Sequence, residues 1–109
     1  MNATKANRNI YFYITQGGLC YYCKKALWNG TELLACSIDH KIPTSRGGKD
    51  VLENTCLACV QCNGSKGNLM ESEVVGVFKM VSDGLIKKSD VTDYVKYLSL
   101  KGKFGELSP

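Results

Sequence analysis

The chain has 109 residues, six of them cysteine, and a formal net charge of +4. This length fits one compact domain over residues 1–109 and excludes a second domain of ordinary size. No apolar run approaches the roughly 20 residues of a membrane-spanning helix, so we expect no membrane partner. The positive charge lies in residues 1–70, where eight Lys or Arg face four Asp or Glu, while residues 71–109 contain six of each. A basic segment favours an anionic partner, although charge alone does not identify one.

The first predicted element lies in residues 1–19, which end in Gly17-Gly18. Residues 1–9 are polar and lack the apolar core of a signal peptide, so we expect a soluble, cytoplasmic protein. The β-branched and aromatic residues of the run 10–14 favour a strand. A helix that ends at Gly17 fits the same run, so both alternatives stay open.

Two Cys-x-x-Cys pairs come next, Cys20 with Cys23 and Cys59 with Cys62. In a reducing compartment such pairs bind metal more often than they form disulfides. Two pairs complete a tetrahedral zinc site, with zinc–sulfur distances of about 2.3 Å and no position left for a substrate. The sequence therefore predicts a structural Zn²⁺, an additional support that is unsurprising in a domain this short. Redox-active dithiols or a pair of disulfides are the alternatives.

Other cysteines and aromatic residues surround these pairs. Cys36 and Cys56 belong to neither pair, and we expect both to be buried, inert thiols. The rings of Tyr21, Tyr22 and Trp28 are able to stack on nucleic-acid bases. Because aromatic residues near a small zinc site more often enclose its core, we expect that role for all three.

The dipeptide Asn29-Gly30 favours a tight hairpin turn between the apolar segments 26–28 and 33–38. We therefore expect two strands here, the second of which runs up to His40. The following loop, 43–48, is too rich in turn-forming residues to be regular. A helix is predicted to begin near Asn63.

Residues 71–109 are expected to form two helices. In the first helix apolar residues recur at helical spacing, and Gly84 is a plausible end. In the second helix Ser89 is the expected N-cap, and the acids Asp90 and Asp93 lie in the first turn, which the helix dipole favours. The expected apolar faces are Val74, Val75, Phe78 and Val81, then Val91, Tyr94, Val95 and Leu98. We expect these helices mainly to support the rest of the domain, with a dimer surface or a DNA-contacting arm as the alternative.

The segment between and after the cysteine pairs carries the motif that identifies a family. It resembles the HNH nucleases, whose motif runs Asp-His-x-x-Pro, a glycine-containing loop, a central Asn, and then Cys-x-x-Cys-Asn-x-x-Lys-Gly. The match spans residues 20–68 and is specific, because order and spacing both agree. In this chain the matching residues are Asp39, His40, Pro43, Gly47, Gly48, Asn54, Cys59, Cys62, Asn63, Lys66 and Gly67.

This resemblance implies an α+β fold of the small, zinc-stapled ββα-metal type, with additional C-terminal helices. A β-hairpin would present Asp39 and His40 and would pack on a helix that presents Asn63. Residues 20–68 would form the catalytic core, and residues 71–109 a helical extension of the same domain.

The resemblance also implies a role for each matching residue. Asp39 and Asn63 would bind a catalytic Mg²⁺ or Mn²⁺, and His40 would activate the attacking water. Asn54 would hold the loop near the histidine, and Lys66 would help to offset phosphate charge. The implied activity is endonucleolytic cleavage of DNA to 5′-phosphate and 3′-hydroxyl ends, without a small-molecule cofactor.

The chemistry of these side chains agrees with such a role. His40 is the only histidine, and an imidazole with a pKa of about 6.5 suits a general base near neutral pH. A Mg²⁺ ion held by one carboxylate and one amide oxygen keeps coordination sites for water and phosphate. The glycines Gly47, Gly48 and Gly67 permit unusual backbone angles and a close approach to phosphate.

The chain also departs from the family pattern. Asn63 replaces the second histidine of the motif, a variant that also occurs in the family. Gln61 and Ser65 stand where relatives often carry Arg or Lys, which leaves fewer phosphate contacts on the helix. A non-catalytic zinc module that binds nucleic acid or protein is the alternative function, and a zinc-chelating redox protein is a third. Restriction, intron homing, phage DNA processing and defence all use this fold, so a phage or mobile-element origin fits as well.

Overall fold

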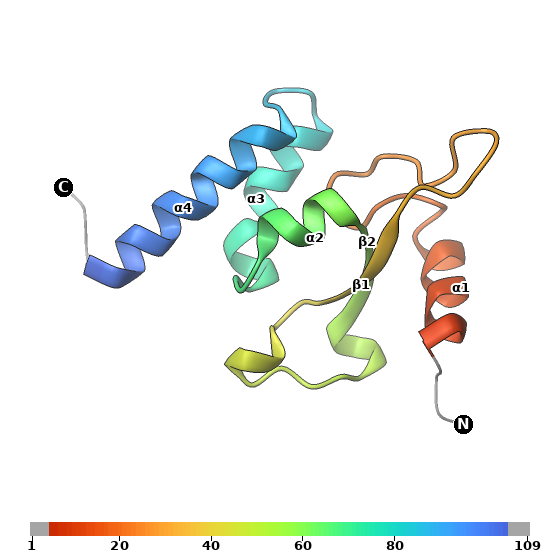
Figure 1. Cartoon of the computed structure of the whole chain (residues 1–109), viewed down its shortest axis with the longest axis horizontal. Helices are drawn as coiled ribbons and strands as arrows, with labels where there is room; N and C mark the ends of the chain where they lie inside the picture. Colours follow the sequence, from red (N-terminus) through yellow and green to blue (C-terminus); the bar gives the residue numbers. More distant parts are fainter. Residues whose placement is uncertain (1–4, 105–109) are drawn as a thin grey trace.

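The computed structural model describes the backbone of residues 5–104 and the side chains of residues 7–101. Two antiparallel strands and a short helix form a ββα unit, with one helix on one side of it and two on the other (Figure 1). The elements in chain order are α1 (Lys5–Thr15), β1 (Cys36–His40), β2 (Thr55–Cys59), α2 (Val60–Lys66), α3 (Glu71–Ser82) and α4 (Lys88–Phe104). The predicted α+β class and ββα arrangement are therefore confirmed.

The first element is a helix, α1, which decides between the two alternatives left open by the sequence. Phe12 is buried and Tyr13 is half-buried, whereas Ile10 and Ile14 on the outer side are exposed. The helix ends where Gly18 donates its backbone N–H to the carbonyl of Tyr13 at 2.8 Å, with a φ of 75° at Gly18. This left-handed ending needs no side chain, which is why a glycine pair stops the helix.

The sheet consists of β1 and β2, and its register places the sites. Asp39 lies opposite Cys56, and His40 lies opposite Thr55. All five residues of β2 are buried, so this strand runs through the centre of the molecule. The connection 41–54 contains two single 3₁₀ turns, Thr44–Arg46 and Leu52–Asn54.

The prediction of two strands around Asn29-Gly30 is wrong in its pairing. Within this fully described stretch only an isolated bridge joins Trp28 to Leu33, and β1 pairs with β2 instead. The side chain of Asn29 accepts a hydrogen bond from the backbone of Thr31 at 2.9 Å, and this side-chain bond competes with a strand ladder. The turn is present, but the two bridge residues, Trp28 and Leu33, are both exposed, and no strand extends from them.

Helix α2 begins at Val60, earlier than the predicted start near Asn63. Its N-cap is Cys59, whose sulfur accepts a hydrogen bond from the backbone N–H of Cys62. A thiol is an unusual cap, so sequence rules based on Ser, Thr, Asp and Asn did not indicate it. The helix ends at Gly67, where φ is 55°.

The two C-terminal helices are present, and Gly84 follows the first with a φ of 78°. The inner face of α3 includes Val77, whereas Val75 is 51% exposed, so one predicted core residue is wrong. In α4, Val91 is fully buried, but the predicted Tyr94 is exposed. A helix period of 3.6 residues leaves the edges of an apolar face ambiguous in short helices.

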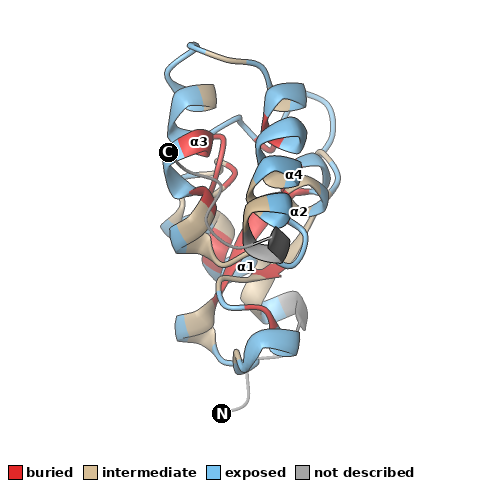
Figure 2. Cartoon of the chain, turned by 90° about the vertical axis from the view of Figure 1, so that its left-hand side faces the viewer, coloured by how far each residue is buried: buried red, intermediate tan, exposed pale blue. Residues whose placement is uncertain are grey.

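The core is continuous from α1 through the sheet to α3 and α4 (Figure 2). Its largest buried apolar side chains include Leu27, Leu57, Val74, Phe78 and Val91. The prediction that the aromatic residues enclose the core is confirmed for Tyr22, which is buried, and is wrong for Trp28, which is 50% exposed. Among the described residues, no helix is long and apolar enough to cross a membrane.

Candidate active site and metal centre

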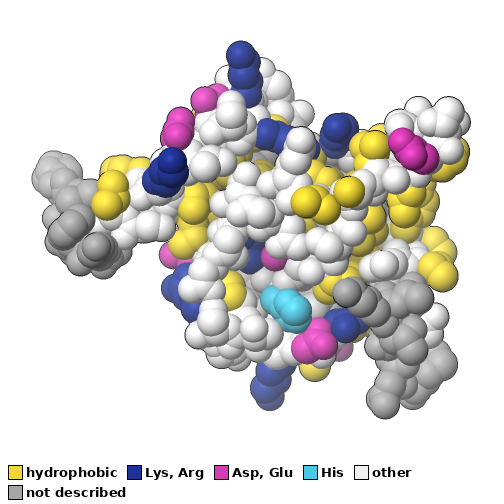
Figure 3. Space-filling view, in the orientation of Figure 1, with side chains coloured by type: hydrophobic (Ala, Val, Ile, Leu, Met, Phe, Trp, Pro, Cys, Tyr) yellow, Lys and Arg dark blue, Asp and Glu magenta, His cyan; other side chains and the backbone are white. Residues whose placement is uncertain are grey.

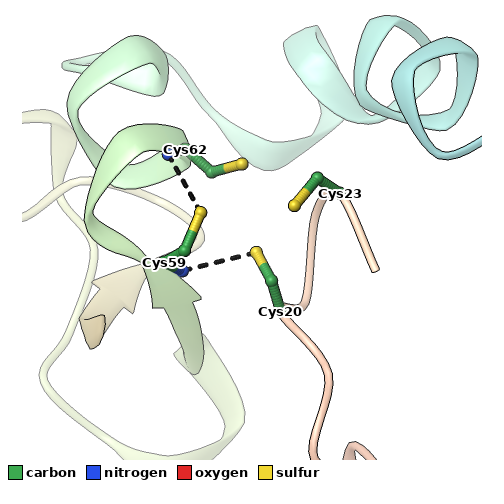
Figure 4. A group of neighbouring side chains, drawn as sticks. All are labelled: Cys20, Cys23, Cys59 and Cys62. Carbon is green, nitrogen blue, oxygen red and sulfur yellow. Dashed lines mark hydrogen bonds between the residues drawn. The ribbon is translucent and has the colours of Figure 1, made fainter. Parts of the chain in front are cut away.

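Four cysteine side chains converge between the segment after α1 and the start of α2 (Figure 4). All four are buried, and their sulfur atoms lie within 4.8 Å of one another. Four sulfurs bound to one zinc ion at about 2.3 Å lie about 3.8 Å apart, so the cluster fits a tetrahedral site. The four residues are those predicted, Cys20, Cys23, Cys59 and Cys62.

The protein surrounds these sulfurs with hydrogen-bond donors. The backbone N–H of Cys59 donates to the sulfur of Cys20 at 3.4 Å. The ammonium of Lys88, at the start of α4, lies 3.2 Å from the sulfur of Cys59. Such donors favour thiolates, which are the form of cysteine that binds metal. A closed set of four thiolates leaves no position for a substrate, so this centre is structural.

The other two cysteines lie outside the cluster. Cys56 is buried in β2, and burial raises the pKa of its thiol to about 12, which keeps it neutral. Cys36 is only half-buried, so the expectation that both are buried holds for Cys56 alone. Burial also raises the pKa of the Cys36 thiol above its usual value.

Asp39, the residue of β1 that the resemblance implies as an ion ligand, is buried. Its side chain is 6% exposed. The hydroxyl of Tyr22 donates to Oδ2 of Asp39 at 2.5 Å. Burial, with the nearby Cys56 and Asp39, raises the pKa of Tyr22 above its usual range, so the phenol stays a proton donor. Tyr22 lies between Cys20 and Cys23 in the sequence, so its hydroxyl links the metal-binding turn to the carboxylate of Asp39.

Lys66 is the second buried charge and the partner of Asp39. Its Nζ lies 3.3 Å from Oδ2 of Asp39, and it donates to the backbone carbonyl of His40 at 2.9 Å. The lysine side chain is 1% exposed, so it does not reach the surface. A charge buried to this degree is held only when it is paired and hydrogen-bonded, as it is here.

His40 occupies the last position of β1 and reaches the surface, where the histidine is cyan in Figure 3. Its side chain is 30% exposed, and its Nε2 lies 3.0 Å from Oδ1 of Asp50. Successive residues of a strand point to opposite faces, so His40 does not share the buried environment of Asp39. The imidazole is thus accessible from solvent while its neighbour is not.

Asn63 lies on α2, one residue after Cys62. Its amide nitrogen donates to the hydroxyl of Ser37 on β1 at 2.7 Å, which leaves the amide carbonyl oxygen as its acceptor. Ser37 and Asp39 share a face of β1, while Asn63 and Lys66, three residues apart, share a face of α2. The two predicted ion ligands therefore lie on the facing surfaces of the strand and the helix.

Asn54 connects the two ends of the loop 41–54. Its side-chain oxygen accepts from the backbone N–H of Ile42, and its nitrogen donates to the carbonyls of Ile42 and Lys49, all at 2.9 Å. Gly48 lies so close that an added Cβ would stand 1.7 Å from the Ile42 carbonyl oxygen. Glycine is therefore required at position 48 because there is no space for a side chain, and not because of its backbone angles.

The structure thus brings Asp39 together with Lys66 and sets Asn63 nearby on the same helix face, whereas the imidazole of His40 contacts Asp50. The donor set of Asp39 and Asn63, one carboxylate and one amide oxygen, fits the preference of Mg²⁺ or Mn²⁺ for oxygen. The carboxylate already has a cation beside it in Lys66, so the site is close to neutral by itself.

Sequence reasoning missed several residues of this region. Asp50 and its partner Arg8 are 42 positions apart in the chain, and no motif links them. The position of Tyr22 between two metal-binding cysteines indicates that it lies near the metal centre. The motif does not reveal that its hydroxyl contacts Asp39.

Comparison with known proteins adds one finding. A family model described as HNH endonuclease matches residues 20–79, which is more than half of the chain. The matched span contains the four cysteines, both strands, α2 and most of α3. Helices α1 and α4 lie outside it. The search of curated proteins found no match.

Proposed function

Because the chain belongs to the HNH endonuclease family, we propose that it hydrolyses phosphodiester bonds in DNA with the help of one divalent ion and leaves 5′-phosphate and 3′-hydroxyl ends. The observation that carries this proposal is the end of β1, where an accessible imidazole follows a carboxylate that faces helix α2. In this proposal residues 20–68 are the catalytic core and residues 71–109 extend the same domain.

His40 is the general base. Its side chain is partly exposed, so a water molecule can approach it. A neutral ring nitrogen accepts the proton of the attacking water as the new oxygen–phosphorus bond forms. Lys66 donates a hydrogen bond to the backbone carbonyl of His40, which helps to fix the position of the residue and of its ring.

Asp39 and Asn63 hold the Mg²⁺ or Mn²⁺. When bound, the ion stabilises negative charge on the phosphate and on the departing sugar oxygen. Tyr22 keeps one oxygen of Asp39 in place, and Ser37 keeps the amide of Asn63 in place. Both ligands are therefore oriented before an ion arrives.

Lys66 contributes positive charge from a buried position. Because it is 1% exposed, it acts on the phosphate through its field and not by contact. Its Nζ lies 3.3 Å from the buried Asp39, so each of the two buried side chains has a polar partner. Asn54 supports the same site by closing the loop that follows His40.

The test uses supercoiled plasmid incubated with the zinc-loaded protein and Mg²⁺, Mn²⁺ or EDTA, and scores nicked against linear product. We expect cleavage with either ion and none in EDTA. His40→Ala should lower the rate by on the order of 10²–10⁴, while zinc content and DNA binding in EDTA remain. Thr31→Ala is the matched control, because it changes an exposed residue of the turn at Asn29-Gly30, outside the proposed site.

Two outcomes would overturn the proposal. Cleavage by His40→Ala at the wild-type rate, with contaminating nuclease excluded, would show that His40 is not the base. Absence of cleavage under all ions, with DNA still bound, would favour the non-catalytic zinc module.

A further inference from the structure

Asp50 lies in the loop between the strands and contacts the imidazole of His40. Its Oδ1 is 3.0 Å from Nε2 of His40 and 2.6 Å from NH1 of Arg8. Its Oδ2 is 3.3 Å from NH2 of Arg8. One carboxylate is thus shared between the ring and both ends of a guanidinium.

Arg8 gives this contact its rigidity. The side chain of Arg8 is only 13% exposed, although that of Asp50 is 58% exposed. A guanidinium that binds a carboxylate with two nitrogens fixes both its position and its plane. Arg8 belongs to α1, which lies outside the matched span 20–79, so a helix that the family model does not cover is connected to His40 through Asp50.

The contact decides which ring nitrogen carries the proton. The Arg8 guanidinium, with His40, lowers the pKa of Asp50 to about 2, so the carboxylate is an anion and only accepts hydrogen bonds. The neutral imidazole has one N–H, and a carboxylate at Nε2 requires that N–H to be at Nε2. The other nitrogen, Nδ1, is then the one able to take a proton.

We propose that Asp50 is a positioning residue that holds His40 as the Nε2–H tautomer with Nδ1 as the basic nitrogen, and that Arg8 holds Asp50 in place. This inference rests on the proposed function, because it concerns the base of that reaction. It makes α1 part of the catalytic apparatus of this chain.

The direct test is ¹⁵N NMR of the imidazole in the zinc-loaded protein, recorded over a series of rising pH until the ring signals stop changing, so that the neutral ring is the form observed. His40 is the only histidine, so the ring signals need no assignment. We expect the wild type to show a protonated Nε2 and an unprotonated Nδ1. Asp50→Ala should give a mixture of tautomers, and the control Glu53→Ala, another exposed acid of the loop, should not.

The kinetic test separates positioning from binding. Asp50→Ala should lower kcat by about 10–100-fold, as loss of such supporting partners does, with KM for DNA and the Mn²⁺ requirement unchanged. Asp50→Glu should recover part of the loss, and Arg8→Met should reproduce a smaller loss than Asp50→Ala.

The outcomes distinguish this proposal from the one it rests on. If the wild type does not cleave DNA, the proposed function fails, whereas the tautomer measurement still reports on Asp50. If the wild type cleaves but its tautomer is Nδ1–H, or is the same in Asp50→Ala, the positioning role is wrong and the nuclease proposal stands.

Discussion

The two sites of this protein share helix α2 and differ in how they are closed. At its start Cys59 and Cys62 belong to a cluster in which all four ligands are buried cysteines. Further along, Asn63 and Lys66 face a strand that supplies one carboxylate and ends in an exposed imidazole. The first site has four protein ligands for one ion, whereas the second offers only one carboxylate and one amide oxygen beside a partly exposed imidazole.

The difference shows how a small domain can keep a polar site in order. Buried charges such as Asp39 and Lys66 do little to stabilise a fold by themselves. A metal ion bound by the four cysteines would supply that stability. Because Cys59 is the N-cap of α2 and Cys62 directly precedes Asn63, the ion would also hold the start of this helix. We therefore expect loss of the metal to disturb the open site as well.

The largest expected effect comes from breaking the closed site. Cys59→Ser should release the zinc and unfold the chain, because zinc binding in small domains is worth about 10–16 kcal/mol and is coupled to folding. Metal content and far-UV circular dichroism should show both losses together. Cys36→Ser, a change of the same kind outside the cluster, should keep its zinc and its fold; a folded, zinc-free Cys59→Ser would contradict the prediction.

The open site should respond to changes in its chemistry without unfolding. Asp39→Asn and His40→Ala should both slow cleavage, but for different reasons. Loss of the carboxylate weakens the ion, so higher Mn²⁺ should restore part of the Asp39→Asn rate. Excess metal should not restore His40→Ala, which lacks the base and should stay slower by on the order of 10²–10⁴. Rates measured against Mn²⁺ concentration decide this, and parallel curves for the two variants would refute separate roles.

The closed site was the part that the sequence predicted best. Cysteine spacing is a local signal with a fixed chemical meaning, and the four predicted residues are the ones that converge. The pairing of the strands was harder to predict, because it depends on which distant segment forms hydrogen bonds with a given strand. Asn29-Gly30 turns the chain as expected, but β1 finds its partner in β2 across the loop 41–54.

Helix α1 and the contacts of the open site needed the structure. The residues of α1 fit both a strand and a helix. The burial of Phe12 in the core is a tertiary effect, and it favours the helix. The motif identified Asp39 and His40 but not that one is buried and the other exposed. It also gave no indication of Arg8, because ion pairs between distant segments leave no pattern in a single sequence.

A smaller effect is expected at the contact that joins the two sites. Tyr22→Phe removes only the hydroxyl that donates to Asp39, and its ring should still pack on Phe78. We expect zinc content to be unchanged and Mn²⁺ affinity to fall by about 10-fold, the lower end of the range for supporting partners of metal ligands. Titration calorimetry or electron paramagnetic resonance of bound Mn²⁺ measures it.

Tyr21→Phe is the matched control for that change. Tyr21 lies between the same two cysteines, but its hydroxyl donates to Glu71 instead of Asp39. The ammonium groups of Lys24 and Lys41 each lie 5.0 Å from the centre of its ring. Equal loss of Mn²⁺ affinity in both variants would mean that the tyrosines act only through the zinc-binding turn.

The smallest effect concerns the rim of the closed site. Lys88 donates to the sulfur of Cys59 and to the side chain of Gln61, both at 3.2 Å, and so ties α4 to the zinc centre. Four thiolates around one Zn²⁺ leave a net negative charge that this ammonium offsets. Lys88→Met should therefore speed zinc transfer to a coloured chelator by about threefold or more, less than the 10–100-fold typical of more buried partners. Lys96→Met removes a lysine from the same groove between α2 and α4 and should leave the rate unchanged. If both variants release zinc equally fast, the effect is one of general surface charge, and α4 is not held by the metal centre.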